Sequence, residues 1–256
     1  MTSTAKESLH ALVQLTGFLG DPANDFAILG EGNSSAKIDE NTFWVKASGV
    51  EMRTVQPDSF VQVRFEPVLA MLDGPDLSDE EIRQALSEAK ADPGIVAHPS
   101  VETSFHALCL SLDNVNFVGH THPTAVNAIA CSVGFEEAFS GRLFPDEIVV
   151  CGPAPVLIPY IDPGLPLARE IRRRIDAYRD AYGESPRVIL MQNHGMIALG
   201  ATAKQVMNIT ATMVKTARIL LGTYALGGPH FMSEDAVRRI HTRPDEHYRQ
   251  RLLAGE

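Results

Sequence analysis

The sequence has few cysteines, no long apolar run and no excess of positive charge. Its three cysteines are odd in number and widely spaced, which favours reduced thiols over a disulfide framework. No apolar stretch approaches the length of a membrane-spanning helix, and the first residues lack the apolar core of a signal peptide. We therefore expect a cytoplasmic protein that does not bind a membrane.

Charge and composition limit the partners and the size of the core. The formal net charge is -10, whereas a nucleic-acid-binding surface needs a basic patch. Hydrophobic residues make up 45% of the chain, which is ample for a large core. We expect one domain over residues 1–256, with a polar C-terminal tail from about residue 227. A small molecule is the expected ligand.

Short strand-like runs alternate with helical segments along the chain. The expected strands are Ala36–Ile38, Thr42–Lys46, Val61–Phe65, Val115–Val118, Glu147–Val150, Val156–Ile158, Arg187–Met191 and Met196–Leu199. The expected helices are Glu7–Thr16, Ser78–Ala89, Ser100–Leu112, Ala125–Cys131, Leu167–Tyr182 and Thr202–Leu221, the last stopped by Gly222. Hairpin-like strand pairs interleaved with helices predict the α/β class, a three-layer α/β/α fold with a central, largely antiparallel sheet covered by helices.

A histidine pair ends one apolar run, and a third histidine lies between two others. His120 and His122 follow Val115–Val118, and residues two apart on a strand point to the same face, so both rings could reach one ion. His194 lies in the turn between two expected strands. Three imidazoles leave the fourth tetrahedral position open, which is typical of a catalytic zinc site. Satisfied polar residues at a strand end are the less favoured alternative.

Glu102 is the best candidate for a catalytic acid or base. It is expected in the first turn of the helix that precedes the histidine strand, so the two elements should be neighbours. Proton transfer by this carboxyl would call for a pKa raised by partial burial. A purely structural role is an equally reasonable alternative, because a carboxylate at a helix N-terminus stabilises the helix.

Three polar turns form a second constellation. They contain Gly32, Asn33, Ser48, Gly49 and Ser100. Their hydroxyl, amide and backbone N–H groups are those that bind a phosphate without a positive charge. Ordinary turn chemistry explains any one of these turns by itself.

These motifs resemble those of the class II aldolase/adducin family. The similar segments, in the family's order, are Gly32–Ser35, Ala47–Gly49, Pro99–Glu102, Gly119–Pro123 and Gln192–Gly195. The likeness covers roughly residues 9–221. It is greatest to the aldolase half of bifunctional rhamnulose-phosphate aldolase/dehydrogenase proteins.

The resemblance implies a role for each candidate residue. His120, His122 and His194 would bind Zn2+, with Mn2+, Co2+ or Fe2+ as alternatives. Glu102 would be the further metal ligand that yields its place and takes the substrate proton. The residues that would contact a substrate phosphate are Gly32, Asn33, Ser48, Gly49 and Ser100.

The resemblance also implies a homotetramer whose active sites lie between subunits. In such family members a tyrosine from the neighbouring subunit donates a proton. Tyr160, Tyr224 and Tyr248 are the candidates here, with Tyr160 taken as the first choice. The sequence does not choose among the three.

The resemblance further implies a metal-dependent lyase of carbohydrate metabolism. We expect cleavage of a ketose 1-phosphate to dihydroxyacetone phosphate and an aldehyde. A decarboxylase or an epimerase acting on a sugar acid or a related enolisable substrate needs the same parts and stays open. Phosphate-binding aldolases usually carry serine where this chain has Val101, and the lost hydrogen bond would be worth about 1.5–3 kcal/mol.

Two readings outside this enzyme class are disfavoured. A scaffold domain like those of adducin has lost the metal ligands, whereas this chain keeps the three histidines and Glu102. A hydrolase using metal-bound hydroxide shares the imidazoles. It gives the polar turns and the position of Glu102 no particular role.

Overall fold

The computed structural model describes residues 3–245 of the 256-residue chain. In this part of the chain one sheet runs in the order β3-β2-β1-β4-β7-β6-β5. Its strands are β1 Asn33–Lys37, β2 Thr42–Lys46, β3 Phe60–Arg64, β4 Phe117–Thr121, β5 Val156–Ile158, β6 Val188–Met191 and β7 Gly195–Gly200. Only β5 and β6 pair in parallel, and the other neighbours in the sheet are antiparallel.

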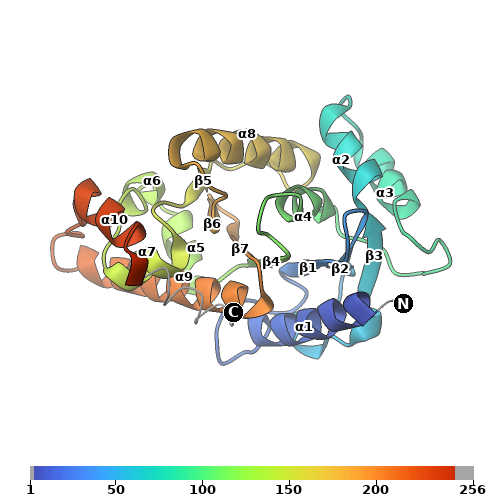
Figure 1. Cartoon of the computed structure of the whole chain (residues 1–256), viewed down its shortest axis with the longest axis horizontal. Coiled ribbons are helices and arrows are strands. Elements are labelled where there is room, and N and C mark those ends of the chain that lie inside the picture. The colour runs from blue at the N-terminus through green and yellow to red at the C-terminus, as the bar shows by residue number, and fades with distance from the viewer. Residues whose placement is uncertain (1–2, 246–256) are drawn as a thin grey trace.

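Helices cover both faces of the sheet (Figure 1). One face carries α2 Phe65–Asp73, α3 Asp79–Glu88, α4 Thr103–Leu110 and α8 Leu165–Tyr182. The other carries α1 Ser3–Leu19, α5 Thr124–Ala130, α6 Phe135–Ala138, α7 Pro145–Cys151 and α9 Ala203–Tyr224. Helix α10 Glu234–His241 contacts α7, and short 3-10 turns occupy Met52–Thr54 and Pro57–Ser59.

Successive residues of a strand point to opposite sides of the sheet. Both faces of this sheet are apolar because hydrophobic residues occupy successive strand positions. In β2, Phe43 and Val45 pack in the core beneath α2, α4 and α8, whereas Trp44 packs in the core against α1. In β6, Ile189 and Leu190 divide in the same way. The three-layer α/β/α fold with a largely antiparallel central sheet is therefore confirmed.

The expected strand Glu147–Val150 is wrong, because these residues lie in helix α7. Pro145 begins the helix, where its fixed φ suits the first turn and its missing N–H costs nothing. The side chain of Glu147 is buried. Its buried carboxylate accepts the Leu143 N–H at 2.8 Å and pairs with Arg142 at 3.0 Å. The run was too short to separate a strand from a helix by periodicity.

Several other element boundaries differ from expectation. Strand β1 begins at Asn33, three residues earlier than expected, since residues 33–36 pair with β4. Helix α9 passes through Gly222 to Tyr224, because a single glycine in a helix costs only about 1 kcal/mol. The expected polar tail contains helix α10, whose cap Ser233 accepts the N–H of Ala236 at 3.3 Å.

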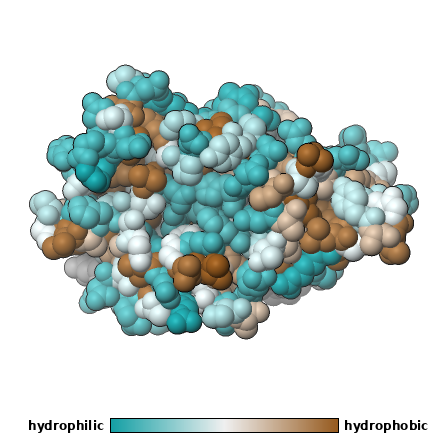
Figure 2. All heavy atoms as spheres, turned by 180° about the vertical axis from the view of Figure 1, so that it is seen from behind, coloured by the Kyte–Doolittle hydropathy of each residue, from teal (hydrophilic) through white to brown (hydrophobic). Residues whose placement is uncertain are grey.

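On one face of the molecule the exposed apolar side chains do not form a continuous patch (Figure 2). Seen from behind, hydrophobic groups are separated by hydrophilic surface (Figure 2). Within residues 3–245, no helix combines the length and the apolarity needed to cross a membrane. The two clusters of buried hydrophobic residues lie between the sheet and its two helical layers.

Candidate metal centre

Three histidines from two parts of the sheet meet at one point. His120 lies in β4, His122 follows that strand, and His194 lies in the turn between β6 and β7. Their ring centroids are 4.7 Å apart for His120 and His122, 4.9 Å for His120 and His194, and 5.1 Å for His122 and His194. One ligand atom of each ring lies within 4.8 Å of those of the other two.

The pairing of β4 with β7 explains why distant histidines converge. Residue Thr121 of β4 lies opposite Met196 of β7, so the turn just before β7 is held beside the end of β4. Asn193 adopts a left-handed conformation with φ of 55°, which turns the chain sharply before His194. A Cβ on Gly195 would lie 2.5 Å from the Thr121 carbonyl oxygen, so the close approach requires glycine.

Hydrogen bonding and burial prepare the histidines to bind a cation. The Nδ1–H of His120 donates to the Met196 carbonyl at 2.9 Å, which leaves Nε2 facing the other rings. The Nε2 atoms of His120 and His122 are 3.0 Å apart. Burial and, to a lesser extent, the charges of His120 and His194 lower the pKa of His122 to about 3. His122 is therefore neutral at physiological pH, the form of an imidazole that can bind a metal ion.

Glu102 completes the cluster from helix α4. Its Oε1 lies 3.2 Å from His194 Nε2 and 3.5 Å from His120 Nε2. We expected Glu102 in the first helical turn, but it is the N-cap residue, and its N–H donates to the Ser100 hydroxyl at 3.2 Å. The helix ends at Leu110, two residues earlier than expected.

The expected rise in the Glu102 pKa is wrong for the metal-free site. Burial by itself raises the pKa, but the charge of His120 and hydrogen bonds from His120 and His194 outweigh that effect. The net pKa lies well below its usual value. Glu102 is consequently ionised, and the imidazoles of His120 and His194 lie beside it.

The three histidines suit a cation site, and Glu102 lies beside two of them. Zinc–nitrogen bonds of about 2.0–2.1 Å place neighbouring ligand atoms of a tetrahedron about 3.3 Å apart. The distances of 3.0, 3.2 and 3.5 Å between ligand atoms of the cluster lie around that value. Nitrogen and carboxylate ligands suit zinc, and they also suit other first-row divalent ions.

The turn Ser48–Gly49 lies beside the segment that precedes Glu102. Ala47 and Pro99 form an isolated β-bridge, and the Ser48 N–H donates to the His98 carbonyl at 2.9 Å. Gly49 has a φ of 79°, so its turn adopts a conformation that favours glycine. The structure thus brings two of the expected polar turns together next to the candidate ligand.

The third expected turn approaches the same region. Gly32 has a φ of 65°, and a Cβ there would lie 2.6 Å from the His120 carbonyl oxygen. The side chain of Asn33 is directed to Glu102, with its Nδ2 donating to Oε2 at 2.6 Å. The phosphate contacts expected of these residues stay predictions.

Sequence reasoning missed Lys46, which is buried at the end of β2. Its Nζ donates to the Val50 carbonyl at 2.6 Å and to the Ala47 carbonyl at 3.3 Å. Burial lowers its pKa to about 8, and the negative charge of Glu102 partly offsets that effect. A lysine that continues the apolar run Phe43–Val45 was the one available signal.

Tyr160 and Tyr224 lie outside the cluster described above. Tyr160 is 55% exposed, and its hydroxyl donates to Asp162 at 2.9 Å. That hydrogen bond and the charge of Asp162 raise the pKa of Tyr160. Tyr224 is exposed at the end of α9, and Tyr248 lies outside the described residues. A role for any of them is still a prediction.

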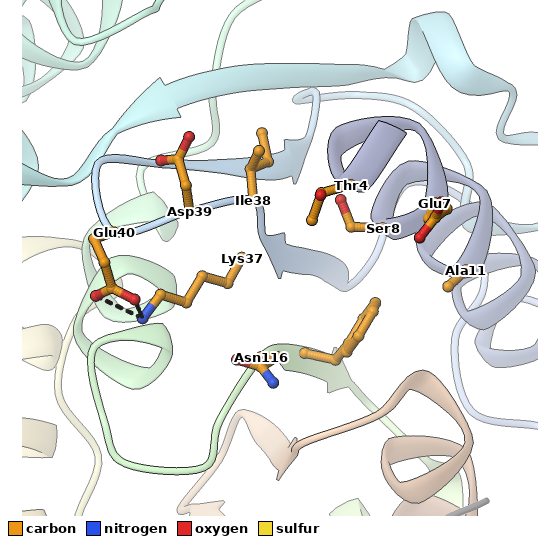
Figure 3. Close-up of a pocket in the computed structure, with 10 residues that line it drawn as sticks. Thr4, Glu7, Ser8, Ala11, Lys37, Ile38, Asp39, Glu40 and Asn116 are labelled. Carbon is orange, nitrogen blue, oxygen red and sulfur yellow. Dashed lines mark hydrogen bonds and ion pairs between the residues drawn. The ribbon is translucent and has the colours of Figure 1, made fainter. Parts of the chain in front are cut away.

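One surface cavity adjoins the histidine cluster. A cavity of about 390 Å3 is lined by His122 together with Glu31, Asp25 and Asn127. A larger cavity of about 470 Å3 lies between α1 and the β1–β2 turn, and no candidate site residue lines it (Figure 3). The former is the cavity that adjoins the histidines.

Comparison with known proteins agrees with this geometry. The sequence profile of the Class II Aldolase and Adducin N-terminal domain matches residues 21–221. The chain is a member of the class II aldolase and adducin family. The likeness to bifunctional aldolase/dehydrogenase proteins is a finer prediction that this match does not test.

Individual relatives of this family member are distant. The uncharacterized oxidoreductase YuxG of Bacillus subtilis (strain 168) is 28% identical over 196 residues, which cover 73% of this chain and 26% of YuxG. This aldolase-family chain therefore spans about a quarter of the length of that curated relative.

Solved structures share the fold at low sequence identity. An L-fuculose 1-phosphate aldolase superposes with a TM-score of 0.68 and 15% identity, covering 94% of this chain and 98% of that one. YgbL of Klebsiella pneumoniae, whose reaction is named only as aldolase/epimerase/decarboxylase, gives 0.66 and 20% identity over 93% of this chain and 100% of YgbL. At these identities the likeness establishes the aldolase-family fold alone.

Proposed function

We propose that this chain is a divalent-metal-dependent aldolase that cleaves a ketose 1-phosphate to dihydroxyacetone phosphate and an aldehyde. The observation that carries the proposal is the convergence of His120, His122 and His194 on one point, with Glu102 Oε1 3.5 and 3.2 Å from two of them. These residues would hold Zn2+, or Mn2+, Co2+ or Fe2+. When bound, the ion would polarise a carbonyl oxygen as a Lewis acid.

Glu102 would move the proton in this reaction. As the carbon–carbon bond breaks, the hydroxyl that becomes the aldehyde loses its proton and an electron pair is left on the carbon next to the carbonyl. That carbon must take a proton to give dihydroxyacetone phosphate. Glu102 lies beside the histidines and is 13% exposed, so it can exchange protons with a bound substrate while bulk water is largely excluded. In the condensation direction the same carboxylate removes that proton.

The phosphate would bind at the adjoining polar turns. Ser48, Gly49 and Ser100 lie on segments joined by the bridge at Ala47, and their hydroxyls and backbone N–H groups suit an anion. Buried Lys46 adds positive charge beneath the same turn. That charge would compensate for the hydroxyl that is absent at Val101, which is 43% exposed.

The family resemblance adds an oligomeric state and a cellular location to the proposal. A homotetramer with active sites between subunits would bring one of Tyr160, Tyr224 or Tyr248 to a neighbouring site. A cytoplasmic location would suit the reduced cysteines. Size-exclusion chromatography with light scattering tests the first of these.

The reaction is tested in the direction of condensation. Metal-loaded protein is incubated with dihydroxyacetone phosphate and a panel of hydroxyaldehydes, and new ketose phosphates are detected by mass spectrometry. We expect a product with at least one aldehyde. A metal-loaded protein that forms no adduct with any aldehyde, and does not cleave ketose 1-phosphates, would contradict the proposal.

A decarboxylase or epimerase is the alternative that the same cluster serves. Either would use the metal and Glu102 on a sugar acid or a related enolisable substrate. Carbon dioxide release from a sugar acid would favour the decarboxylase. Interconversion of two sugar phosphates without release of an aldehyde would favour the epimerase.

Replacing Gly195 with alanine is expected to weaken metal binding. The added Cβ would meet the Thr121 carbonyl and, at 2.6 Å, the His122 ring, so His122 must move. We expect metal affinity to fall about 10- to 100-fold, as for changes in groups that orient a ligand. Isothermal titration with zinc measures it. Gly222→Ala is the matched control, since nothing lies within 4 Å of its Cβ. Equal affinities in the two variants would contradict the account.

A further inference from the structure

A row of buried polar side chains connects Glu102 to the interior of the protein. Asn33 Nδ2 donates to Glu102 Oε2 at 2.6 Å. The Asn33 Oδ1 in turn contacts His106 Nε2, and His106 Nδ1 lies 2.7 Å from the Ser35 hydroxyl. His106 and Ser35 are fully buried, and Asn33 is 4% exposed. The network therefore has no water-exposed member except at the Glu102 end.

The direction of each hydrogen bond in this row follows from its chemistry. An amide oxygen only accepts, so the Nε2 of His106 must carry the hydrogen that it shares with Asn33. Burial lowers the pKa of His106 to about 3, so the ring is neutral and its Nδ1 accepts. The Ser35 hydroxyl is then the donor to Nδ1.

This order fixes which end of the Asn33 amide meets Glu102. A carboxamide can occupy its site in either of two flipped orientations, and neighbouring donors and acceptors decide between them. With its oxygen bound to His106, Asn33 must turn its NH2 group to Glu102. The flipped amide would place Oδ1 against a carboxylate oxygen, which is repulsive.

The fixed amide gives Glu102 two points of attachment. Its Oε2 accepts from Asn33, while its Oε1 faces the imidazoles of His120 and His194. We propose that His106 is a positioning residue that fixes the Asn33 amide and, through it, orients the Glu102 carboxylate for proton transfer. The assignment rests on the proposed function for its catalytic consequence, and on the hydrogen bonds alone for its structural part.

The buried polar row lies on the side of β1 that faces α4 and Glu102. Asn33 and Ser35 point to the α4 side of β1, whereas Ser34 between them points to α1 and lies 2.6 Å from the Thr16 hydroxyl. Asn33 is also the cross-strand partner of His120. The network is thus anchored on β1, which pairs with β4, the strand that carries His120.

Substitution of His106 tests the proposal through activity and rescue. His106→Leu removes the donor to Asn33, and we expect proton exchange into dihydroxyacetone phosphate to slow about 10- to 100-fold, the range of other outer partners of a metal site. His106→Gln keeps an N–H that can reach Asn33 Oδ1, so we expect it to restore most of the rate. Leu110→Ala, a buried change in the same helix, controls for lost packing. A His106→Leu rate equal to that of the wild type would overturn the proposal.

A spectroscopic measurement tests the same proposal without catalysis. The 15N shifts of His106 in the metal-free wild-type protein distinguish the Nε2–H tautomer from the Nδ1–H tautomer. We expect Nε2–H at every pH where the protein is folded, and an Nδ1–H or doubly protonated ring would overturn the assignment. If the wild type exchanges no proton, the proposed function fails, while the tautomer still decides the structural part. The same measurement serves if His106→Leu does not fold.

Discussion

Replacing Glu102 with glutamine is expected to abolish proton transfer while metal stays bound. Glutamine keeps the size of the side chain and an oxygen that can face the cation, but it cannot accept a proton. Positioned acids and bases typically contribute about 10²- to 10⁴-fold, and we expect a loss in that range. Rates of proton exchange and metal content, both measured on purified variants, check the two parts of this prediction.

A nearby carboxylate provides the matched control. Glu31 Oε2 lies 3.9 Å from His122 Nδ1, outside the cluster of ligand atoms. Glu31→Gln therefore removes one negative charge near the histidines without removing the group that faces His120 and His194. We expect a small change in rate. Full activity of Glu102→Gln would remove Glu102 from the mechanism, and an equal loss in both variants would point to charge alone.

Removing one imidazole is expected to have the second large effect. In His120→Asn the cluster loses its fully buried ligand, which a hydrogen bond to Met196 holds in place. We expect metal affinity to fall by more than the roughly 10- to 100-fold typical of outer partners, with a parallel loss of activity. Metal analysis after dialysis and activity against added zinc measure these changes.

Two controls make the histidine experiment specific. His10→Asn changes an exposed histidine of α1 and should alter neither metal content nor rate. Treating the wild type with a chelator should abolish activity, and zinc, manganese or cobalt should restore it. Full activity in the chelated protein, with metal shown to be absent, would contradict a metal-dependent reaction.

Local patterns made the meeting of the three histidines predictable. The His-x-His spacing of His120 and His122 needs only a strand, and the neighbouring apolar run supplies that information. His194 lies 72 positions beyond His122, yet its turn between two strands placed it at an edge of the sheet. Turn position and strand period are short-range properties, so sequence alone could predict them.

Contacts between distant segments were beyond sequence reasoning. The partners Asn33 and His106 are 73 positions apart, and only the pairing of β1 with β4 and the packing of α4 bring them together. The buried Lys46 and the helical form of Glu147–Cys151 also depend on tertiary partners. The ionised state of Glu102 follows from imidazoles on other elements, which explains why burial alone predicted the wrong direction.

Proton exchange tests the central claim most directly. Metal-loaded protein is mixed with dihydroxyacetone phosphate in heavy water, and NMR follows the hydroxymethyl signal next to the carbonyl. We predict stereospecific loss of one of the two protons without any aldehyde present, because Glu102 removes it. No exchange, with metal confirmed in the protein, would contradict an aldolase that uses this phosphate donor.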